Sequence, residues 1–381
     1  MIYLDNAATT FPKPDAVWDA VLRCGRTSCG NPGRSGHPLA AAAAREVFTA
    51  REALAELFNI PDSSRLVFTC NATMALNMAI YGILTDGGHV VTSSMEHNSV
   101  MRPLHHLQRQ GRITLTVVPC SPRGELDPGD VKRAVQADTR LVVLTHASNV
   151  CGTILPVGEV KQCLPDLPLL VDAAQTAGVL PIDVEASGID MLAFSGHKGL
   201  LGPMGTGGLY VAPSLRLEPL MQGGTGSRSE ELMQPDFMPD ALEAGTPDVP
   251  GLSGLHAGIR FLQETGLATV RAHETALTRT LIEGLAGHEK IRIHGLADPV
   301  RQTAVVSITM DERDPGDIAR SLDRDFGIAC RASLHCAPIA HRTLGTYPQG
   351  TVRLSMNYFN KQDDVREAVR ALQVIAEQGE A

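Results

Sequence analysis

Five segments of this 381-residue chain place polar, chemically active side chains directly after short apolar runs. They are Asn71-Ala-Thr73, Glu96-His-Asn98, Ser148-Asn149, Asp172-Ala-Ala-Gln175 and Ser195-Gly-His-Lys198. In an open parallel sheet, ligands bind beyond the carboxyl ends of the strands. If the apolar runs are strands of one such sheet, the five segments meet at one edge and form one site.

Asp172 and Lys198 together suit pyridoxal phosphate, which takes a lysine amine for its Schiff base and a carboxylate beside its pyridine nitrogen. Lys198 lies in a glycine-flanked loop. Desolvation there would lower the pKa of its amine and help it act as nucleophile and proton carrier. A helix beginning at Ala72-Thr73 would offer free backbone N–H groups to the phosphate.

The other polar residues at the strand ends have expected roles toward the same cofactor. These are phosphate binding by Thr73, Ser195 and His197, stacking of the flat His97 ring, and a hydrogen bond to the phenolic oxygen from Gln175 or Asn149. Taken singly, a lysine is usually a solvated surface residue, and an Asp after a strand is often a turn or cap residue. Having both on neighbouring strand ends is what favours a cofactor site.

Two nucleotide-binding motifs are the alternatives for residues 195–208. A P-loop is excluded because its Gly-Lys-Ser/Thr is absent: Lys198 lies between His197 and Gly199. A dinucleotide site is disfavoured because the glycines Gly205 and Gly207 precede an apolar run instead of following one.

Motifs along nearly the whole chain resemble those of the class V aminotransferase-like pyridoxal enzymes, and within them the cysteine desulfurase and selenocysteine lyase branch. The motifs are Tyr3-Leu-Asp-Asn-Ala-Ala-Thr-Thr10, Glu96-His-Asn-Ser99, Val171-Asp-Ala-Ala-Gln175, Ser195-Gly-His-Lys198, Ala244-Gly-Thr-Pro247, Leu334-His-Cys-Ala-Pro338 and Val352-Arg-Leu-Ser355. The resemblance implies a fold type I homodimer whose two active sites lie at the subunit interface.

The resemblance also implies a role for each matching residue. Those roles are Schiff-base lysine for Lys198, pyridine partner for Asp172, phenolic-oxygen donor for Gln175, stacking ring for His97, phosphate ligands for Thr73, Ser195 and His197, a phosphate ligand from the other subunit for Thr246, and substrate-carboxylate binding for Arg353 with Asn149 beside it. A bidentate guanidinium also suits a carboxylate on chemical grounds.

The match is closest to the short-loop desulfurases, because the long serine-rich cysteine loop of the other group is absent. Two features depart from that group. The chain starts directly at the Asp5-Asn6 element, without a leading helix, and the segment Asn31-Pro-Gly-Arg34-Ser-Gly-His37 matches only in part. These departures indicate a separate subfamily.

Cys336 is the residue that points to sulfur or selenium chemistry. It follows His335 in a predicted loop, where a neighbouring imidazole would favour its thiolate. The other cysteines Cys70, Cys151 and Cys163 are expected to be small buried thiols.

The predicted function is a cysteine desulfurase. Lys198 removes the α-proton of L-cysteine, and Lys198 or His97 assists reprotonation. The Cys336 thiolate then takes the sulfur as a persulfide, and alanine is left. The persulfide would pass to an acceptor protein or thiol.

Other functions stay open on the same residues. The nearest is a selenocysteine lyase. Transamination, epimerisation or β-elimination of a cysteine-like amino acid would use the same cofactor, and a non-enzymatic sulfur carrier or scaffold is the alternative outside enzymes. Because Asp172 and Lys198 are both present, the non-enzymatic alternative is disfavoured.

The elements that position these residues follow from the apolar pattern. Near-continuous apolar runs alternate with helical stretches over the first two-thirds, which predicts an α/β fold with a mainly parallel sheet covered on both faces. We expect a large domain over 11–250 and a smaller α+β domain over 251–381 together with 1–10. A Gly-, Ser- and Pro-rich stretch, 222–250, is predicted to be a long loop.

Composition narrows the setting of the protein. Hydrophobic residues make up 43%, enough for a sizeable core, and 42 acidic against 33 basic residues disfavour a nucleic-acid partner. No apolar run is long enough to span a membrane, and no signal peptide is visible, so we expect a cytoplasmic protein. The eight cysteines form no CxxC pair, which predicts reduced thiols and no structural metal.

Overall fold

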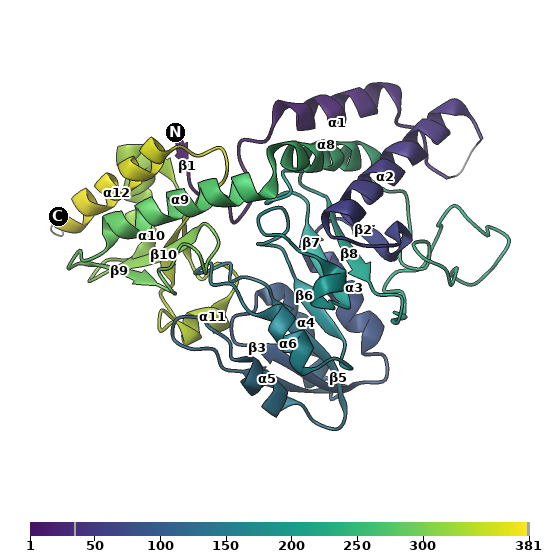
Figure 1. The fold of residues 1–381 in the computed structure, drawn as a ribbon, viewed down its shortest axis with the longest axis horizontal. Helices are drawn as coiled ribbons and strands as arrows, with labels where there is room; N and C mark the ends of the chain where they lie inside the picture. The colour runs from purple at the N-terminus through teal and green to yellow at the C-terminus, as the bar shows by residue number, and fades with distance from the viewer. Residues whose placement is uncertain (34–35, 379–381) are drawn as a thin grey trace.

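The computed structural model describes residues 1–33 and 36–378, which form a large α/β part and a smaller α+β part (Figure 1). The strands are β1 (Ile2–Tyr3), β2 (Leu66–Thr69), β3 (Gly88–Ser93), β4 (Ile113–Val118), β5 (Thr139–Thr145), β6 (Leu169–Asp172), β7 (Met191–Ser195), β8 (Gly207–Val211), β9 (Ile291–His294), β10 (Val305–Met310), β11 (Ile328–Ala329), β12 (Arg331–Ser333) and β13 (Thr351–Ser355). The α-helices are α1 (Asp15–Thr27), α2 (Pro38–Leu57), α3 (Ala72–Ile83), α4 (Asn98–Arg109), α5 (Pro128–Ala134), α6 (Val157–Cys163), α7 (Val184–Ser187), α8 (Val249–Thr265), α9 (Leu267–Leu285), α10 (Pro315–Phe326), α11 (Pro338–Thr343) and α12 (Gln362–Glu377).

The central sheet has seven strands in the order β2-β8-β7-β6-β5-β3-β4. Each strand is parallel to the next along the part of the sheet that runs β7-β6-β5-β3-β4. Strand β8 is antiparallel to both of its neighbours, β2 and β7. The prediction of a mainly parallel sheet is therefore confirmed, with β8 as the exception. The carboxyl ends of β2, β3, β5, β6 and β7 lie on one edge of this sheet.

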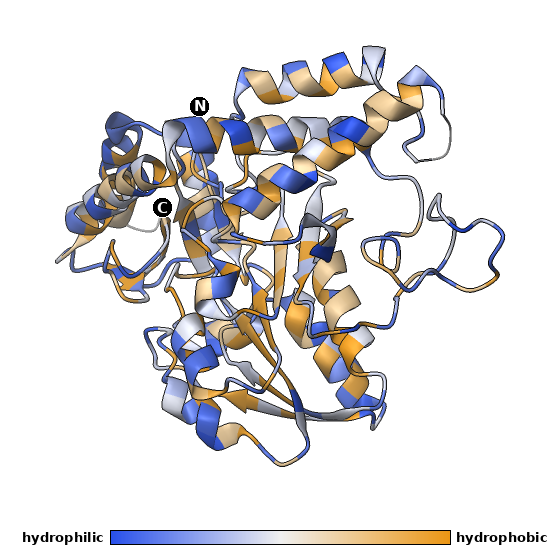
Figure 2. Cartoon of the chain, turned by 45° about the vertical axis from the view of Figure 1, so that its right-hand side comes forward, coloured by the Kyte–Doolittle hydropathy of each residue, from blue (hydrophilic) through white to orange (hydrophobic). Residues whose placement is uncertain are grey.

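Both faces of the central sheet are buried, since alternate residues of a strand point to opposite faces. In β5, Val142 and Leu144 belong to the cluster packed under α2 and α8, while Leu141 and Val143 belong to the cluster under α3 and α4. Figure 2 shows the central strands largely in the colours of apolar residues, surrounded by helices that mix apolar and polar residues. The strands are thus held from two sides.

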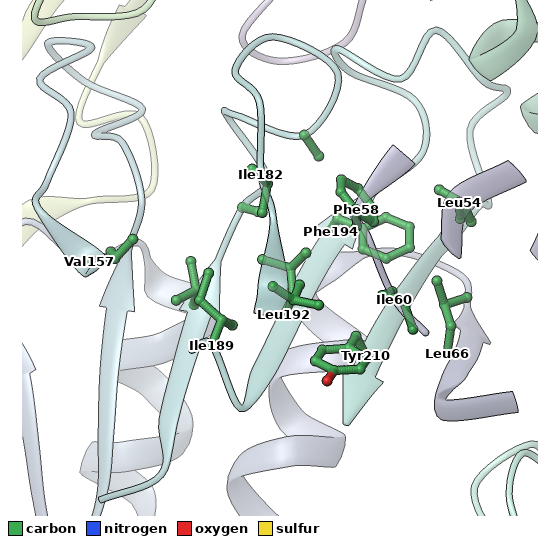
Figure 3. Packing of buried hydrophobic residues seen from close by; sticks show 14 of the residues in the cluster. Leu54, Phe58, Ile60, Leu66, Val157, Ile182, Ile189, Leu192, Phe194 and Tyr210 are labelled. Carbon is green, nitrogen blue, oxygen red and sulfur yellow. The ribbon is translucent and has the colours of Figure 1, made fainter. Parts of the chain in front are cut away.

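Aromatic contacts fix the first of these clusters near the site edge. The rings of Phe58 and Phe194 lie 5.2 Å apart between centroids, and both side chains are fully buried. Figure 3 shows them beside Leu54, Ile60 and Leu192. Each such side chain contributes about 1.5–3 kcal/mol on burial. Because Phe194 immediately precedes Ser195, this packing fixes the end of β7.

The second part is an antiparallel sheet, β12-β13-β10-β9, covered by α9, α10 and α12 (Figure 1). The N-terminus joins it: β1 pairs with β11, and Leu4 lies in the same hydrophobic cluster. Helix α8, by contrast, contributes Leu252, Leu255 and Ile259 to the core of the large part. We propose two domains as predicted, with the boundary moved from residue 250 to near Gly266, between α8 and α9.

The long loop predicted before α8 is present. Residues 212–248 contain no helix or strand, and the segment exposes Leu232 and Met233. Helices α1 and α2 were not predicted from the sequence; they cover the large part beside α8 (Figure 1). Within the described residues, none of the helices is both long enough and apolar enough to cross a membrane.

Candidate active site

Asp172 and Lys198 lie at the ends of adjacent strands, as the sequence predicted. Asp172 is the last residue of β6, and its register partner in β7 is Ala193, five residues before Lys198. Asp172 is buried; its Oδ1 accepts a hydrogen bond of 2.9 Å from Ala174 N. Burial raises the pKa of this carboxyl, and Ala174 N and the Lys198 amine oppose that rise.

The amine of Lys198 is tuned by the same surroundings. Its pKa is lowered to about 8: burial is the main cause, Asp172 partly opposes the shift, and Arg353 and Arg331 add to it. Its backbone carbonyl accepts a 2.6 Å hydrogen bond from Thr10 Oγ1. The result is an amine that is neutral in a far larger fraction at pH 7 than a free lysine, held next to a carboxylate.

The start of α3 lies against the end of β7. Ala72 N donates to Ser195 Oγ at 3.1 Å, and Met74 N donates to the capping Oδ1 of Asn71 at 2.9 Å. Thr73, between them, is exposed. The helix N-terminus, the Thr73 hydroxyl and Ser195 are thereby gathered at one place, which suits an anion.

His97 caps α4 with its ring. Nδ1 accepts from Ser99 N at 3.1 Å and lies 2.8 Å from Ser99 Oγ. Burial, together with the charges of Lys198, Arg331 and Arg102, lowers the ring's pKa to about 4, so the ring is neutral. Since Nδ1 is an acceptor, the proton of the neutral ring sits on Nε2. His97 is therefore a flat, neutral ring with one N–H free for the site.

The N-terminal segment closes over the loop that carries Lys198. The His197 carbonyl accepts from Thr10 N at 3.2 Å and from Lys13 Nζ at 3.0 Å, and His197 Nδ1 lies 3.0 Å from Thr9 Oγ1. Gln175 Nε2 donates to Ala7 O at 3.1 Å. His197 and Gln175 are thus near the predicted site, but their bonds here are to residues 7–13.

Arg353 and Asn149 are neighbours, as predicted. Arg353 is 1% exposed, and its guanidinium donates to Asn149 O at 3.0 Å and to Asp5 Oδ1 at 2.8 Å, while Nε is buried without a partner. Asn149 Nδ2 donates to His335 O at 2.8 Å. Arg353, which is predicted to bind the substrate's carboxylate, is thus already paired with the carboxylate of Asp5.

Cys336 lies at the exposed tip of a turn that is joined to the start of α4. Its carbonyl accepts from Asn98 N at 2.8 Å, and Arg331 Nη2 lies 3.6 Å from its Sγ. The expectation that His335 stabilises the thiolate is wrong: this ring is buried and bonds Arg331 O and His341 instead. Arg331 is the cation beside the sulfur.

A cavity of about 490 Å³ brings three predicted residues together, since Thr73, His97 and Cys336 all line it, along with Arg102. Thr246 does not line this cavity. It is exposed and lines a separate one of about 600 Å³, together with Thr69 and Cys70.

Several residues that complete the site were missed by the sequence reasoning. Asp5 and Glu96 lie inside the motifs that carry the resemblance, and Arg331 lies five residues before Cys336. These positions in the sequence were the only clue to their place at the site. Glu96 is fully buried, accepts from Ser93 Oγ at 2.5 Å and Thr145 N at 2.9 Å, and its pKa is raised by burial to about 8.

The remaining candidates that the structure describes lie outside this arrangement. Cys151 is buried as expected, but Cys70 is exposed, so its predicted burial was wrong. His37 caps α2 by accepting from Ala40 N at 3.1 Å, Asn31 is exposed, and Arg34 lies outside the described residues. Within the part of the chain that the structure describes, no cluster of His, Cys, Asp and Glu could hold a metal ion.

Fold and site together define a two-part α/β protein with a lysine and a carboxylate on adjacent strand ends. The family model Aminotransferase class-V matches residues 2–367, so the chain belongs to the class V aminotransferase family. A probable cysteine desulfurase of Methanothermobacter thermautotrophicus is 36% identical over 99% of this chain and 95% of its own. A cysteine desulfurase of Yersinia pseudotuberculosis is 31% identical over 98% and 93%.

Solved structures of cysteine desulfurases share the fold of this chain. The apo cysteine desulfurase of Thermococcus onnurineus superposes with a TM-score of 0.92 at 31% identity, covering 99% of this chain and 94% of that one. The cysteine desulfurase CsdA of Escherichia coli superposes with a TM-score of 0.87 at 28% identity, covering 99% and 94%. The predicted fold type, a large α/β part with a smaller α+β part, is confirmed by these neighbours.

Proposed function

We propose that this chain is a pyridoxal-phosphate-dependent cysteine desulfurase that converts L-cysteine to L-alanine and keeps the sulfur as a persulfide on Cys336. The names of its relatives support the reaction. The main structural support for this proposal is the 2.8 Å hydrogen bond from Asn98 N to Cys336 O. This bond joins the turn that carries the nucleophile to the His97 loop, at the sheet edge that also holds Lys198.

The donor set of this edge fits pyridoxal phosphate. Lys198 would hold it covalently through its amine, and the start of α3 with Thr73, Ser195 and His197 would hold the phosphate. The buried Asp172 carboxyl, whose pKa burial raises, suits a cationic ring nitrogen that supplies the missing positive charge. When bound, this cofactor supplies an electron sink for negative charge at the substrate's Cα.

The chain's own residues then bind the substrate and move its protons. Lys198 Nζ, with its pKa lowered to about 8, takes the α-proton in its neutral form. The neutral His97 ring carries its proton on Nε2 and can offer it as a hydrogen bond to the reacting group. Arg353 binds the substrate carboxylate, which competes with Asp5 for the guanidinium.

Cys336 completes the reaction beside Arg331. As its thiolate attacks the substrate sulfur, an S–S bond forms and the substrate's Cβ–S bond breaks, with the bonding pair staying on carbon. That carbon takes up a proton, so cysteine and the Cys336 thiol become alanine and a Cys336 persulfide. The Arg331 guanidinium, 3.6 Å from Sγ, places a positive charge beside the attacking sulfur.

Product analysis with L-cysteine and L-selenocysteine side by side tests this function. The wild-type holoenzyme should release alanine from cysteine and, without reductant, carry a persulfide on Cys336 that mass spectrometry locates. Cys336→Ala should form no alanine from cysteine, yet keep part of its turnover of selenocysteine, because a selenol leaves more readily than a thiol.

Cys70→Ala is the matched control, since Cys70 is an exposed cysteine at a strand end. It should desulfurate cysteine like the wild type. Turnover of selenocysteine but not cysteine by the wild type would make the protein a selenocysteine lyase. Full activity of Cys336→Ala on cysteine would remove Cys336 from the mechanism.

The setting of the enzyme is part of the proposal. We propose a cytoplasmic homodimer with active sites shared between subunits, which passes its sulfur to an acceptor protein or thiol. The exposed apolar side chains of the 212–248 segment, among them Leu232 and Met233, support a second copy as a neighbour, since patches of this kind mark interfaces.

A further inference from the structure

The turn that carries Cys336 has an unusual backbone. Ser333, His335 and Cys336 have φ angles of 93°, 49° and 57°, in the left-handed region that non-glycine residues rarely adopt. Such a turn persists only when its surroundings hold it. Two of its carbonyls are held from outside, that of His335 by Asn149 and that of Cys336 by Asn98.

A third attachment is made by the His335 ring, which points away from Cys336 into the protein. Its Nε2 lies 3.1 Å from Arg331 O, and its Nδ1 lies 3.3 Å from His341 Nε2. His341 Nδ1 in turn lies 2.7 Å from Thr346 Oγ1. The two rings are stacked, with centroids 5.5 Å apart and planes 25° from parallel. We call these four residues, Arg331, His335, His341 and Thr346, the histidine chain.

The donors and acceptors of the histidine chain have only one consistent arrangement. A carbonyl only accepts, so His335 Nε2 carries a proton and donates to Arg331 O. Both rings are 2% exposed or less, and burial lowers the pKa of His335 to about 2 and of His341 to about 4, so both are neutral. His335 Nδ1 therefore accepts from His341 Nε2, and His341 Nδ1 accepts from the Thr346 hydroxyl.

The histidine chain ends at Arg331, the residue whose side chain lies beside the Cys336 sulfur. Arg331 offers its carbonyl to His335 and its Nη2, 3.6 Å away, to Cys336 Sγ. The chain thus fixes both ends of the turn, the strand β12 that carries Arg331 and the ring of the residue before Cys336. Its members His341 and Thr346 touch no part of the proposed reaction.

We propose that His341 and Thr346 are positioning residues for Cys336: through His335 they hold its turn in the left-handed conformation and keep the sulfur beside Arg331. This inference rests on the proposed function only in taking Cys336 as the nucleophile. The role is distinct from catalysis, because among the described residues the side chains of His341 and Thr346 bond only to His335 and to each other.

Thr346→Val tests the proposal, with Thr346→Ser as its matched control. Valine keeps the shape of threonine but leaves His341 Nδ1 without a donor, whereas serine keeps the hydroxyl. In the holoenzyme, Thr346→Val should form the Cys336 persulfide on the order of tenfold more slowly, since small displacements of a reacting group have effects of this size. Thr346→Ser should stay near the wild-type rate.

Two further readouts separate positioning from a general loss of structure. Exchange of the α-proton of L-alanine with deuterated solvent needs Lys198 but not Cys336, and it should be unchanged in Thr346→Val. Amide hydrogen exchange in the peptide covering 333–341 should become faster in Thr346→Val. This second readout needs no activity, so it stands even if the protein proves not to be a desulfurase.

Thr139→Val controls for the loss of any buried threonine–histidine bond, because Thr139 Oγ1 lies 2.8 Å from His89 Nδ1 in the central sheet. It should leave persulfide formation and exchange at 333–341 unchanged. If Thr346→Val and His341→Gln both keep the wild-type persulfide rate and the wild-type exchange of 333–341, the histidine chain does not position Cys336. Equal slowing of α-proton exchange and persulfide formation would also overturn the proposal.

Discussion

Lys198 carries a prediction at the scale of a single residue, because its amine must be neutral to react with an aldehyde. Burial lowers its pKa to about 8 from 10.5. Covalent incorporation of pyridoxal phosphate into the cofactor-free protein should therefore accelerate as pH rises and level off above about pH 8. Absorbance during reconstitution measures the rate, and borohydride reduction with mass spectrometry locates the modified residue.

The sign of the Asp172 contribution sharpens this test. The Asp172 carboxylate raises the pKa of Lys198, so Asp172→Asn should move the midpoint of incorporation to lower pH. Lys198→Ala should show no covalent incorporation at any pH. A midpoint near 10.5, or one that Asp172→Asn leaves in place, would mean that the amine is not desolvated beside this carboxylate.

Single residues also show what the sequence could predict at the site. Lys198, Asp172, Thr73 and Ser195 follow apolar strands directly, so their place at one sheet edge follows from strand order alone. The partners of Cys336 did not follow. His335 is its sequence neighbour, but a left-handed turn directs the ring inward and leaves Arg331, from β12, beside the sulfur.

At the scale of one element, the N-cap of α3 links stability to cofactor binding. Asn71→Ala removes the acceptor of Met74 N and should lower the free energy of unfolding by about 1 kcal/mol. It should also weaken pyridoxal phosphate binding, because the phosphate is expected at this helix start. Asp127→Ala removes the equivalent cap of α5 and should cost similar stability without changing cofactor affinity. Equal cofactor affinity in both variants would place the phosphate elsewhere.

The pair of Asp5 and Arg353 joins the N-terminal segment to β13. Asp5→Ala leaves the Arg353 guanidinium, 1% exposed, without its charged partner, and should destabilise the protein by about 3 kcal/mol. The exposed pair of Asp363 and Arg366 is the control, since its loss should cost less than about 1 kcal/mol. Denaturant unfolding measures both. Similar effects of Asp5→Ala and Asp363→Ala would show that the Arg353 site tolerates an unpaired cation.

The elements themselves were predictable where burial sets the pattern. The alternation of strands and helices in the first two-thirds was predicted correctly, and α3 begins at Ala72 as expected, because both faces of the sheet are apolar. The antiparallel direction of β8 could not be predicted, since an apolar run has the same pattern in a parallel and in an antiparallel strand. Short strands such as β11 and β12 are fixed by tertiary contacts with β1 and β13 and leave no periodic signal.

At the scale of the whole molecule, the position of Thr246 argues for an active site built from two chains. Within one chain Thr246 is exposed and lies outside the cavity that holds Thr73, His97 and Cys336. A two-fold dimer would bring the same segment of the second copy to each site. If Thr246 acts across that interface, a mixed dimer of Lys198→Ala and Thr246→Ala subunits contains one site that has both the lysine and the threonine.

Purified mixed dimers with two different tags measure this directly. They should recover about half of the wild-type rate on L-cysteine, because one of the two symmetric sites is intact. A mixed dimer of Lys198→Ala and Asp172→Ala is the control: both residues belong to the same chain's site, so each of its sites lacks one group and no activity should return. If the Thr246→Ala homodimer is itself impaired and the first mixture shows no recovery, Thr246 serves the site of its own chain, and the active site is not shared.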